Sequence, residues 1–276
     1  MLVQFERIIS RVHAYTYRMV DWGRQRPVLR SGGDEAGTAP KEHGAALTPF
    51  ACPGESVVTL SAAPRLYEDE HLISVNKLVA APTQVNRTGS IAPASVGKLY
   101  DVHRLDTPVS GVVLYARTRT VASRLSDMFR RGEIRKTYWA AVESPPEPYA
   151  GELEHYLVHR HKENRSVWYG RPMPGGKRCV CRYTTIGASD RYWFVELHPE
   201  SGRTHQLRVQ LSAIGCPVKG DRKYGARRGN RDRMIHLHAR ELSFRHPILE
   251  HPISIVAAPP ADPVWDTLTE QLDRAV

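Results

Sequence analysis

The feature that most constrains the fold is a series of short strand-like segments that starts near Leu66 and continues through much of the chain. Each is rich in β-branched or aromatic residues, which favour strands. The clearest segments are residues 72–76, 111–116, 137–142, 178–186 and 192–197. Residues 187–190 predict a hairpin turn between the last two segments. We therefore expect an α+β fold built on a mixed, mainly antiparallel β-sheet with flanking helices.

Two amphipathic segments interrupt this pattern and predict helices. Residues 118–131 form the longer one, and Gly132 follows where a helix is expected to stop. Its apolar face consists of Val121, Leu125, Met128 and Phe129. The second places Leu207, Leu211 and Ile214 on one face, with Gly215 as the stop. The glycine-rich segment 215–225 after it is basic and suits phosphate positioning.

Residues 1–62 differ in composition from the rest of the chain. Arginine recurs along their first half, and residues 31–40 lack any hydrophobic period, which is typical of a linker or long loop. Elsewhere within residues 1–62, residues 5–12 fit a short helix and residues 57–60 a short strand. We expect a small basic N-terminal appendage at 1–62, followed by the main domain at 63–276.

Charge and composition point to a polyanionic partner. The 276 residues contain 39 Lys and Arg against 29 Asp and Glu, a net charge of +10. Arginine is the commoner cation, and its planar guanidinium suits phosphate contacts and base stacking. No apolar run is long enough for a membrane helix, and four scattered cysteines suit a reducing compartment. We expect a cytoplasmic protein, with mitochondrial targeting by the Arg-rich start as the minor alternative.

Residues 103–111, His-Arg-Leu-Asp-Thr-Pro-Val-Ser-Gly, lead directly into a strand-like segment. They place Asp106 in a tight loop at the mouth of that strand, with Arg104 as a possible counter-ion. Carboxylates in such loops serve catalysis, but an Asp near a Pro can equally cap a turn.

A second polar cluster occupies residues 201–208, at the start of the shorter helix. His205 and Arg208 are three residues apart and can point into one cleft. Arg203 and Thr204 would lie at the helix N-terminus, where free N–H groups favour an anion. A solvated helix face is the alternative. Tyr138, in the strand-like segment 135–142, can stack on a base and exchange a proton, although a core role is equally ordinary.

The 13 histidines and the pair Cys179 and Cys181 are residue types that can bind a metal ion. No second pair of ligands stands at zinc-finger spacing, so we expect no metal.

Five segments in fixed order resemble the RluA-type pseudouridine synthases. They are HRLDTPVSG with GVVLYAR, RKTYWAAV, GKRCVCRYTTI, SGRTHQLRVQLSAIGCPVKGDRKYG and LHARELSFRHP. The resemblance covers about residues 66–262, and several ordered motifs are far more specific than one. It implies the pseudouridine synthase fold with a central catalytic cleft at 63–276, a monomeric enzyme without cofactor, and an rRNA or tRNA substrate. It also offers a divergent α-L-type RNA-binding module as one identity for the appendage at 1–62.

The resemblance also implies roles for individual residues. Asp106 matches the catalytic aspartate, Tyr138 the active-site tyrosine, Arg208 the arginine paired with that aspartate, and Arg104 the arginine linked to flipping the target uridine. We expect further RNA contacts from the polar residues of the same motifs, namely His103, Arg203, His205, Gln206, Lys219, Arg222 and Lys223.

The sequence departs from the family pattern at Leu78, Val109 and Gln210. These positions stand where the family has Pro, Thr and His, and we expect them to affect substrate choice more than chemistry. Two alternatives stay open: a non-catalytic RNA-binding protein of the same fold, and a metal-dependent hydrolase that uses the histidines.

Overall fold

The computed structural model describes residues 63–85, 90, 92 and 97–275. The predicted N-terminal appendage, with its helix and strand, lies outside the described residues. Within the described part, no helix is long and apolar enough to cross a membrane.

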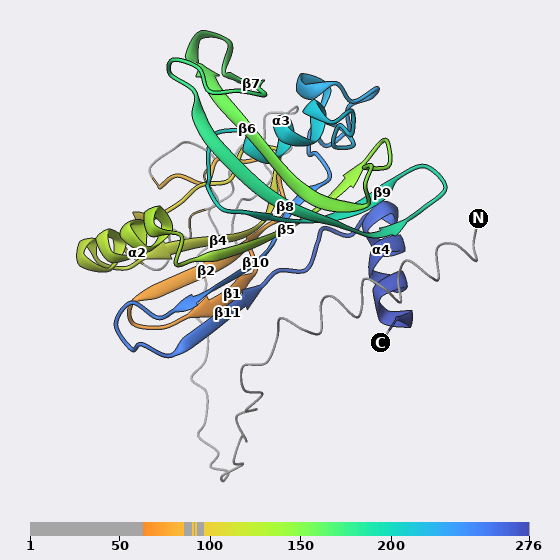
Figure 1. Ribbon diagram of the computed structural model, residues 1–276. Helices are drawn as coiled ribbons and strands as arrows, with labels where there is room; N and C mark the ends of the chain where they lie inside the picture. The colour runs from red at the N-terminus through yellow and green to blue at the C-terminus, as the bar shows by residue number, and fades with distance from the viewer. Residues whose placement is uncertain (1–62, 86–89, 91, 93–96, 276) are drawn as a thin grey trace, which may run out of the picture. The chain divides into compact units, whose positions relative to one another are not determined.

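The described residues form an eleven-stranded sheet in the order β1-β2-β4-β10-β5-β9-β8-β6-β7, with β11 beside β10 and β3 beside β4 (Figure 1). The strands are β1 (Arg65–Glu68), β2 (Leu72–Lys77), β3 (Tyr100–Asp101), β4 (Ser110–Ala116), β5 (Arg135–Val142), β6 (Ala150–Arg160), β7 (Arg165–Tyr169), β8 (Lys177–Ala188), β9 (Trp193–Pro199), β10 (Leu237–Arg245) and β11 (Pro252–Val256). Neighbours are antiparallel except β4 and β10, which are parallel. The predicted mixed, mainly antiparallel sheet is confirmed.

The five strand-like segments coincide with β2, β4, β5, β8 and β9. The predicted turn at 187–190 is displaced, because β8 continues to Ala188, which pairs with Trp193. The turn instead lies at 189–192, where the Ser189 N–H donates to the Tyr192 carbonyl at 2.7 Å.

Helices cover both faces of the sheet. Helix α2 (Arg119–Arg131) packs on alternate residues of β4, including Val112 and Leu114. Helix α4 (Pro263–Arg274) packs against Trp139 and Ala141 of β5. Helix α3 (Gln206–Ala213) packs through Leu207 and Leu211 on the opposite face, which carries Ala140 and Val142 of β5. Because successive residues of a strand point to opposite faces, Tyr138 lies on the α3 side.

Helix α2 is capped at both ends, and the stop predicted at Gly132 is confirmed. The Thr118 side chain accepts a hydrogen bond from the Val121 N–H at 3.3 Å, which caps the N-terminus. Gly132 ends the helix in the left-handed region at φ 73°.

Strand β10 joins the two halves of the sheet, between β4 and β5. It approaches β4 very closely at Gly111, where a Cβ would lie 2.2 Å from the Ala239 carbonyl oxygen. Gly111 also has φ +114°, which side chains rarely adopt. Only glycine therefore fits this point, directly after the loop that carries Asp106.

Candidate active site

Asp106 lies in the loop between β3 and β4, near the middle of the sheet. A turn closes the loop, because the Val109 N–H donates to the Asp106 carbonyl at 2.9 Å. The side chain of Asp106 is 17% exposed, so it is accessible to a substrate without being fully solvated.

The side chain of Lys77, the last residue of β2, binds the backbone of the loop that carries Asp106. It is fully buried, and its Nζ donates to the carbonyls of Asp106 at 3.2 Å, Thr107 at 2.6 Å and Val109 at 2.5 Å. Burial lowers the pKa of Lys77 to about 7, although the negative charge of Asp106 opposes that shift. The three acceptors match the three N–H bonds of a charged ammonium. Sequence reasoning missed Lys77, although a lysine that ends an apolar strand is an available signal.

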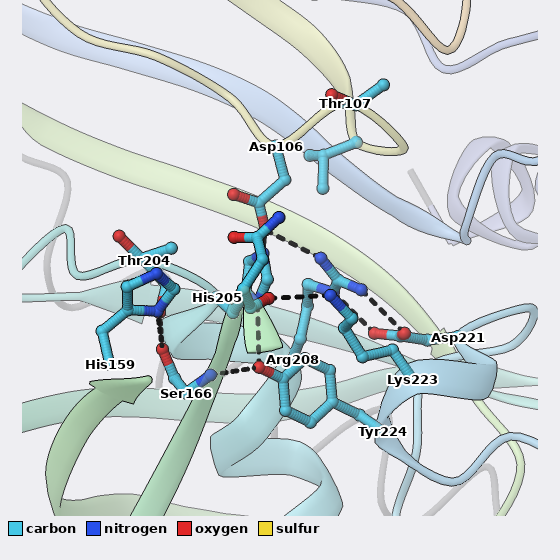
Figure 2. A network of polar contacts seen from close by, with 12 residues as sticks. Asp106, Thr107, His159, Ser166, Thr204, His205, Arg208, Asp221, Lys223 and Tyr224 are labelled. Atoms are coloured by element: carbon cyan, nitrogen blue, oxygen red, sulfur yellow. Dashed lines mark hydrogen bonds and ion pairs between the residues drawn. The ribbon is translucent and has the colours of Figure 1, made fainter. Parts of the chain in front are cut away.

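Arg208 connects Asp106 to a second carboxylate. Its Nη1 donates to Asp106 Oδ2 at 3.0 Å, and its Nε and Nη2 donate to the two oxygens of Asp221 at 2.6 and 2.8 Å (Figure 2). Burial alone would lower the pKa of Arg208, but the hydrogen bonds and charges of Asp221 and Asp106 raise it. The guanidinium is therefore a fixed cation. In the sequence, Asp221 stands out only as a member of the glycine-rich basic segment 215–225.

His205 lies beside the same carboxylate. Its Nε2 is 3.7 Å from Asp106 Oδ2, and its Nδ1 is 2.8 Å from the Tyr224 hydroxyl. Burial lowers the pKa of His205 to about 4, assisted by the Arg208 and Lys223 charges and opposed by Asp106 and Asp221. The imidazole is thus neutral at physiological pH.

The structure places Arg203 and Thr204 in the loop before helix α3, which begins at Gln206 with His205 as its N-cap residue. The Arg203 N–H donates to Gln206 Oε1 at 3.1 Å. The anion site at Arg203 and Thr204 stays a prediction.

Tyr138 lies on the α3 face of β5, opposite Ala239 of β10 and Leu197 of β9. Burial raises the pKa of its hydroxyl, and the nearby charge of Asp106 and the Cys181 thiol add to the rise. Tyr138 therefore offers a ring face and an intact O–H, not a phenolate.

The predicted RNA-contact residues fall into two groups. Arg104, Arg203, Arg222 and Lys223 are exposed. His103, Gln206 and Lys219 have partners within the chain: His103 Nε2 accepts from the Leu114 N–H at 2.9 Å, the Gln206 Oε1 accepts from the Ser201 hydroxyl at 2.7 Å, and the Lys219 Nζ donates to Asn230 Oδ1 at 3.0 Å. Burial, with the Lys136 charge, lowers the pKa of His103 to about 4. These three side chains stabilise the site's surroundings.

The three departures from the family pattern lie around the site. Val109 is buried in the core and supplies a carbonyl to Lys77, while Gln210 is fully buried and its Nε2 donates to the carbonyls of Leu153 and Cys179 at 3.0 and 3.2 Å. Leu78 directly follows Lys77 and is half-buried. Val109 and Gln210 therefore contribute to packing.

Metal coordination has no support in the side-chain arrangement. Within residues 63–85, 90, 92 and 97–275, no three His, Cys, Asp or Glu side chains are grouped as metal ligands. The described cysteines, Cys179, Cys181 and Cys216, are free and buried.

Comparison with known proteins identifies the family of this site. The family model for RNA pseudouridylate synthase matches residues 70–213. The chain is 33% identical over 209 residues to the uncharacterized RNA pseudouridine synthase YjbO of Bacillus subtilis, covering 71% of this chain and 72% of that protein. It is also 33% identical over 216 residues to the dual-specificity RNA pseudouridine synthase RluA of Escherichia coli, covering 71% of this chain and 92% of that protein.

Solved structures agree with this result. Human RNA pseudouridylate synthase domain containing 4 aligns with a TM-score of 0.60 at 27% identity, over 76% of this chain and 92% of that one. The matched region contains Asp106, Tyr138 and Arg208 and ends within α3. The chain belongs to the RNA pseudouridylate synthase family.

Proposed function

We propose that this enzyme isomerises specific uridines of a structured RNA to pseudouridine through Asp106, with rRNA as the first candidate substrate and tRNA as the second. The observation that carries the proposal is the array of Asp106, Arg208 and Asp221, in which a buried, doubly anchored cation holds an accessible carboxylate. An Asp that only caps a turn would not need a buried ion pair to hold its carboxylate.

The chemistry conserves every atom. The bond between uracil N1 and ribose C1′ breaks, a bond from C5 to C1′ forms, C5 loses its proton and N1 gains one. A carboxylate can assist by attacking the base or C1′, or by removing a sugar proton. Arg208 keeps the Asp106 carboxylate oriented in each case.

Tyr138 fits the later part of the reaction. It shares the α3 face of the sheet with the site, and the Asp106 charge acts on its hydroxyl. A neutral phenol can stack on a flipped uracil and take part in moving the C5 proton.

RNA must bring its target base out of a helix to reach this carboxylate. The exposed cations Arg104, Arg203, Arg222 and Lys223 suit contacts to the flanking phosphates. One similar relative bears a name that states an RNA class: tRNA pseudouridine synthase C of Pectobacterium carotovorum, 31% identical. The name of RluA states a dual specificity without naming the RNA classes. These names support tRNA as a candidate substrate class. The proposal includes a monomer in the cytoplasm, where free thiols such as those of Cys179 and Cys216 are ordinary.

The test is Asp106→Ala, with Asp106→Asn as the near-isosteric variant. We expect both to abolish pseudouridine formation and to bind RNA with an affinity close to that of the wild type. Pseudouridine mapping in total RNA from cells with and without the gene identifies the substrate, and that RNA then serves for binding and single-turnover assays. Wild-type pseudouridine formation by Asp106→Asn would overturn the proposed role of Asp106. RNA binding by the wild type with no pseudouridine formed in any RNA would favour a non-catalytic RNA-binding protein.

A further inference from the structure

Two successive hydrogen bonds connect the backbone N–H of Ser166 to the Tyr224 hydroxyl and that hydroxyl to His205. The Ser166 N–H donates to the Tyr224 hydroxyl oxygen at 2.8 Å (Figure 2). A backbone N–H can only donate, so the Tyr224 oxygen must accept this bond. The proton of the hydroxyl is then left for its other neighbour, His205 Nδ1, at 2.8 Å.

This polarity fixes the tautomer of His205. Among the described residues, no acceptor other than His205 Nδ1 contacts the buried Tyr224 hydroxyl. If Nδ1 carried a proton, the hydroxyl hydrogen of Tyr224 would be buried without a partner, which costs free energy. Nδ1 is therefore the acceptor, and the single proton of the neutral ring resides on Nε2.

The ring is held in one orientation. His205 is 8% exposed and has a left-handed backbone with φ 57°, an uncommon conformation for a residue other than glycine. Tyr224 and His159 both pack edge-on against it, with ring centroids 5.6 and 6.0 Å away. The Nε2–H consequently points to Asp106 Oδ2 at 3.7 Å, a separation that a bound substrate can shorten.

Two donors therefore converge on the same oxygen of Asp106. Arg208 Nη1 already binds Oδ2 at 3.0 Å, and His205 faces that atom as well. In the part of the chain that the structure describes, no hydrogen bond reaches Oδ1. The two oxygens of the carboxylate are thus chemically distinct before any substrate binds.

We infer that His205 is a positioning residue for Asp106: Tyr224 holds it in the Nε2–H tautomer, and its N–H, with Arg208, secures Oδ2 so that Oδ1 is the oxygen that reacts with uridine. The inference deepens the proposed function and rests on it. The ionisable groups that act on His205 are Asp106, Arg208, Asp221 and Lys223, and they leave the ring neutral.

The first test is Tyr224→Phe. This variant removes the hydroxyl and keeps the ring that lies 5.1 Å from the Arg208 guanidinium. His205 can then move its proton to Nδ1 and turn a lone pair toward the Asp106 anion. We expect kcat to fall by about 10- to 100-fold, the range found when a supporting hydrogen bond behind a catalytic group is lost, while KM for RNA stays within about twofold.

Tyr183→Phe is the matched control. It removes another largely buried tyrosine hydroxyl, which donates to the Pro148 carbonyl at 2.8 Å instead of to a site residue. We expect its kcat to equal that of the wild type. An equal loss of kcat in both variants, or no loss in Tyr224→Phe, would overturn the inference.

A double-mutant cycle tests whether the two residues act as one unit. His205→Asn suits the left-handed backbone, because Asn tolerates it. Its shorter side chain cannot bring an N–H donor to the position of His205 Nε2, which lies 3.7 Å from Asp106 Oδ2. We expect Tyr224→Phe to cost nothing further in the His205→Asn background. Additive losses would contradict a shared role.

Nitrogen NMR of histidine-labelled protein reads the tautomer without any assay of activity. We expect a protonated Nε2 and an unprotonated Nδ1 for His205 in the wild type, and a mixture in Tyr224→Phe. A protonated Nδ1 in the wild type would overturn the inference even if the enzyme is active. If Asp106→Asn proves fully active, the proposed function fails while the tautomer assignment can still hold, so the two failures are distinguishable.

Discussion

The two carboxylate oxygens of Asp221 accept hydrogen bonds from Nε and Nη2 of Arg208 at 2.6 and 2.8 Å. The Nη1 of the same guanidinium donates to Asp106 at 3.0 Å. Asp221→Asn replaces one acceptor with an NH2 group that would face an arginine N–H. We expect a loss of about 3 kcal/mol in the free energy of unfolding, typical of a broken buried ion pair, and a kcat about 10- to 100-fold lower because Arg208 loses its anchor. Urea unfolding and single-turnover kinetics measure the two effects.

The control for this variant is Glu154→Gln. Glu154 also binds an arginine through two hydrogen bonds, to Arg178 at 2.9 and 2.6 Å, but that pair is exposed. Exposed pairs contribute little to stability because solvent screens them, and this one is remote from the chemistry. A similar loss of stability in both variants would show that burial of the Asp221 pair has no special importance.

Lys77→Met tests the support beneath the catalytic loop. Methionine fills a similar volume but leaves the three carbonyls without a donor. We expect the free energy of unfolding to fall by about 2 kcal/mol or more, and kcat to fall while the Kd for RNA stays unchanged. Exposed Lys98 provides a control, since Lys98→Met should alter neither value. Normal kcat in Lys77→Met would mean that the loop holds its shape without the lysine.

Gly111→Ala tests the close approach of β4 and β10. A Cβ at this position would lie 2.2 Å from the Ala239 carbonyl oxygen, on a backbone with φ +114°. The strands must separate to admit it, so we expect destabilisation by several kcal/mol and little soluble protein at 37 °C. Gly170→Ala, where the nearest atom is 4.0 Å away, should behave like the wild type in thermal unfolding. Equal melting temperatures for the two variants would contradict this reading.

The free energy of unfolding should decrease as the pH becomes mildly acidic. Burial is the largest of the effects that lower the pKa of His103, His205 and His238 to about 4. Between about pH 6.5, the ordinary histidine value, and pH 4, the unfolded chain binds protons that the folded chain does not. The free energy of unfolding should therefore fall as the pH decreases through this window, which urea titrations at several pH values would measure. A flat profile would show that these histidines become protonated in the folded protein.

Local patterns in the sequence were sufficient for α2, five strands and the shared location of His205 and Arg208, which both lie beside Asp106, because each depends on residues close in the chain. Strand β6 was missed although buried Leu153 and Leu157 alternate with exposed charges such as Glu152, a pattern typical of a half-buried strand. Other failures have a different cause. Lys77 meets the Asp106 loop about 30 residues away, and Tyr224 reaches Ser166 across 58 residues. Sequence spacing carries no information on such contacts.

The position of β10 has a consequence for how the enzyme is made. Asp106 and Lys77 lie on the β2–β4 side of this strand, whereas Tyr138 and Arg208 come from β5 and α3 on the other side. The ribosome releases both sides before it releases residues 237–245, and pairings so distant in sequence form late. A nascent chain that lacks β10 holds two half-sheets with the carboxylate on one and its arginine on the other. We therefore expect Asp106 and Arg208 to come together only after the ribosome has released β10.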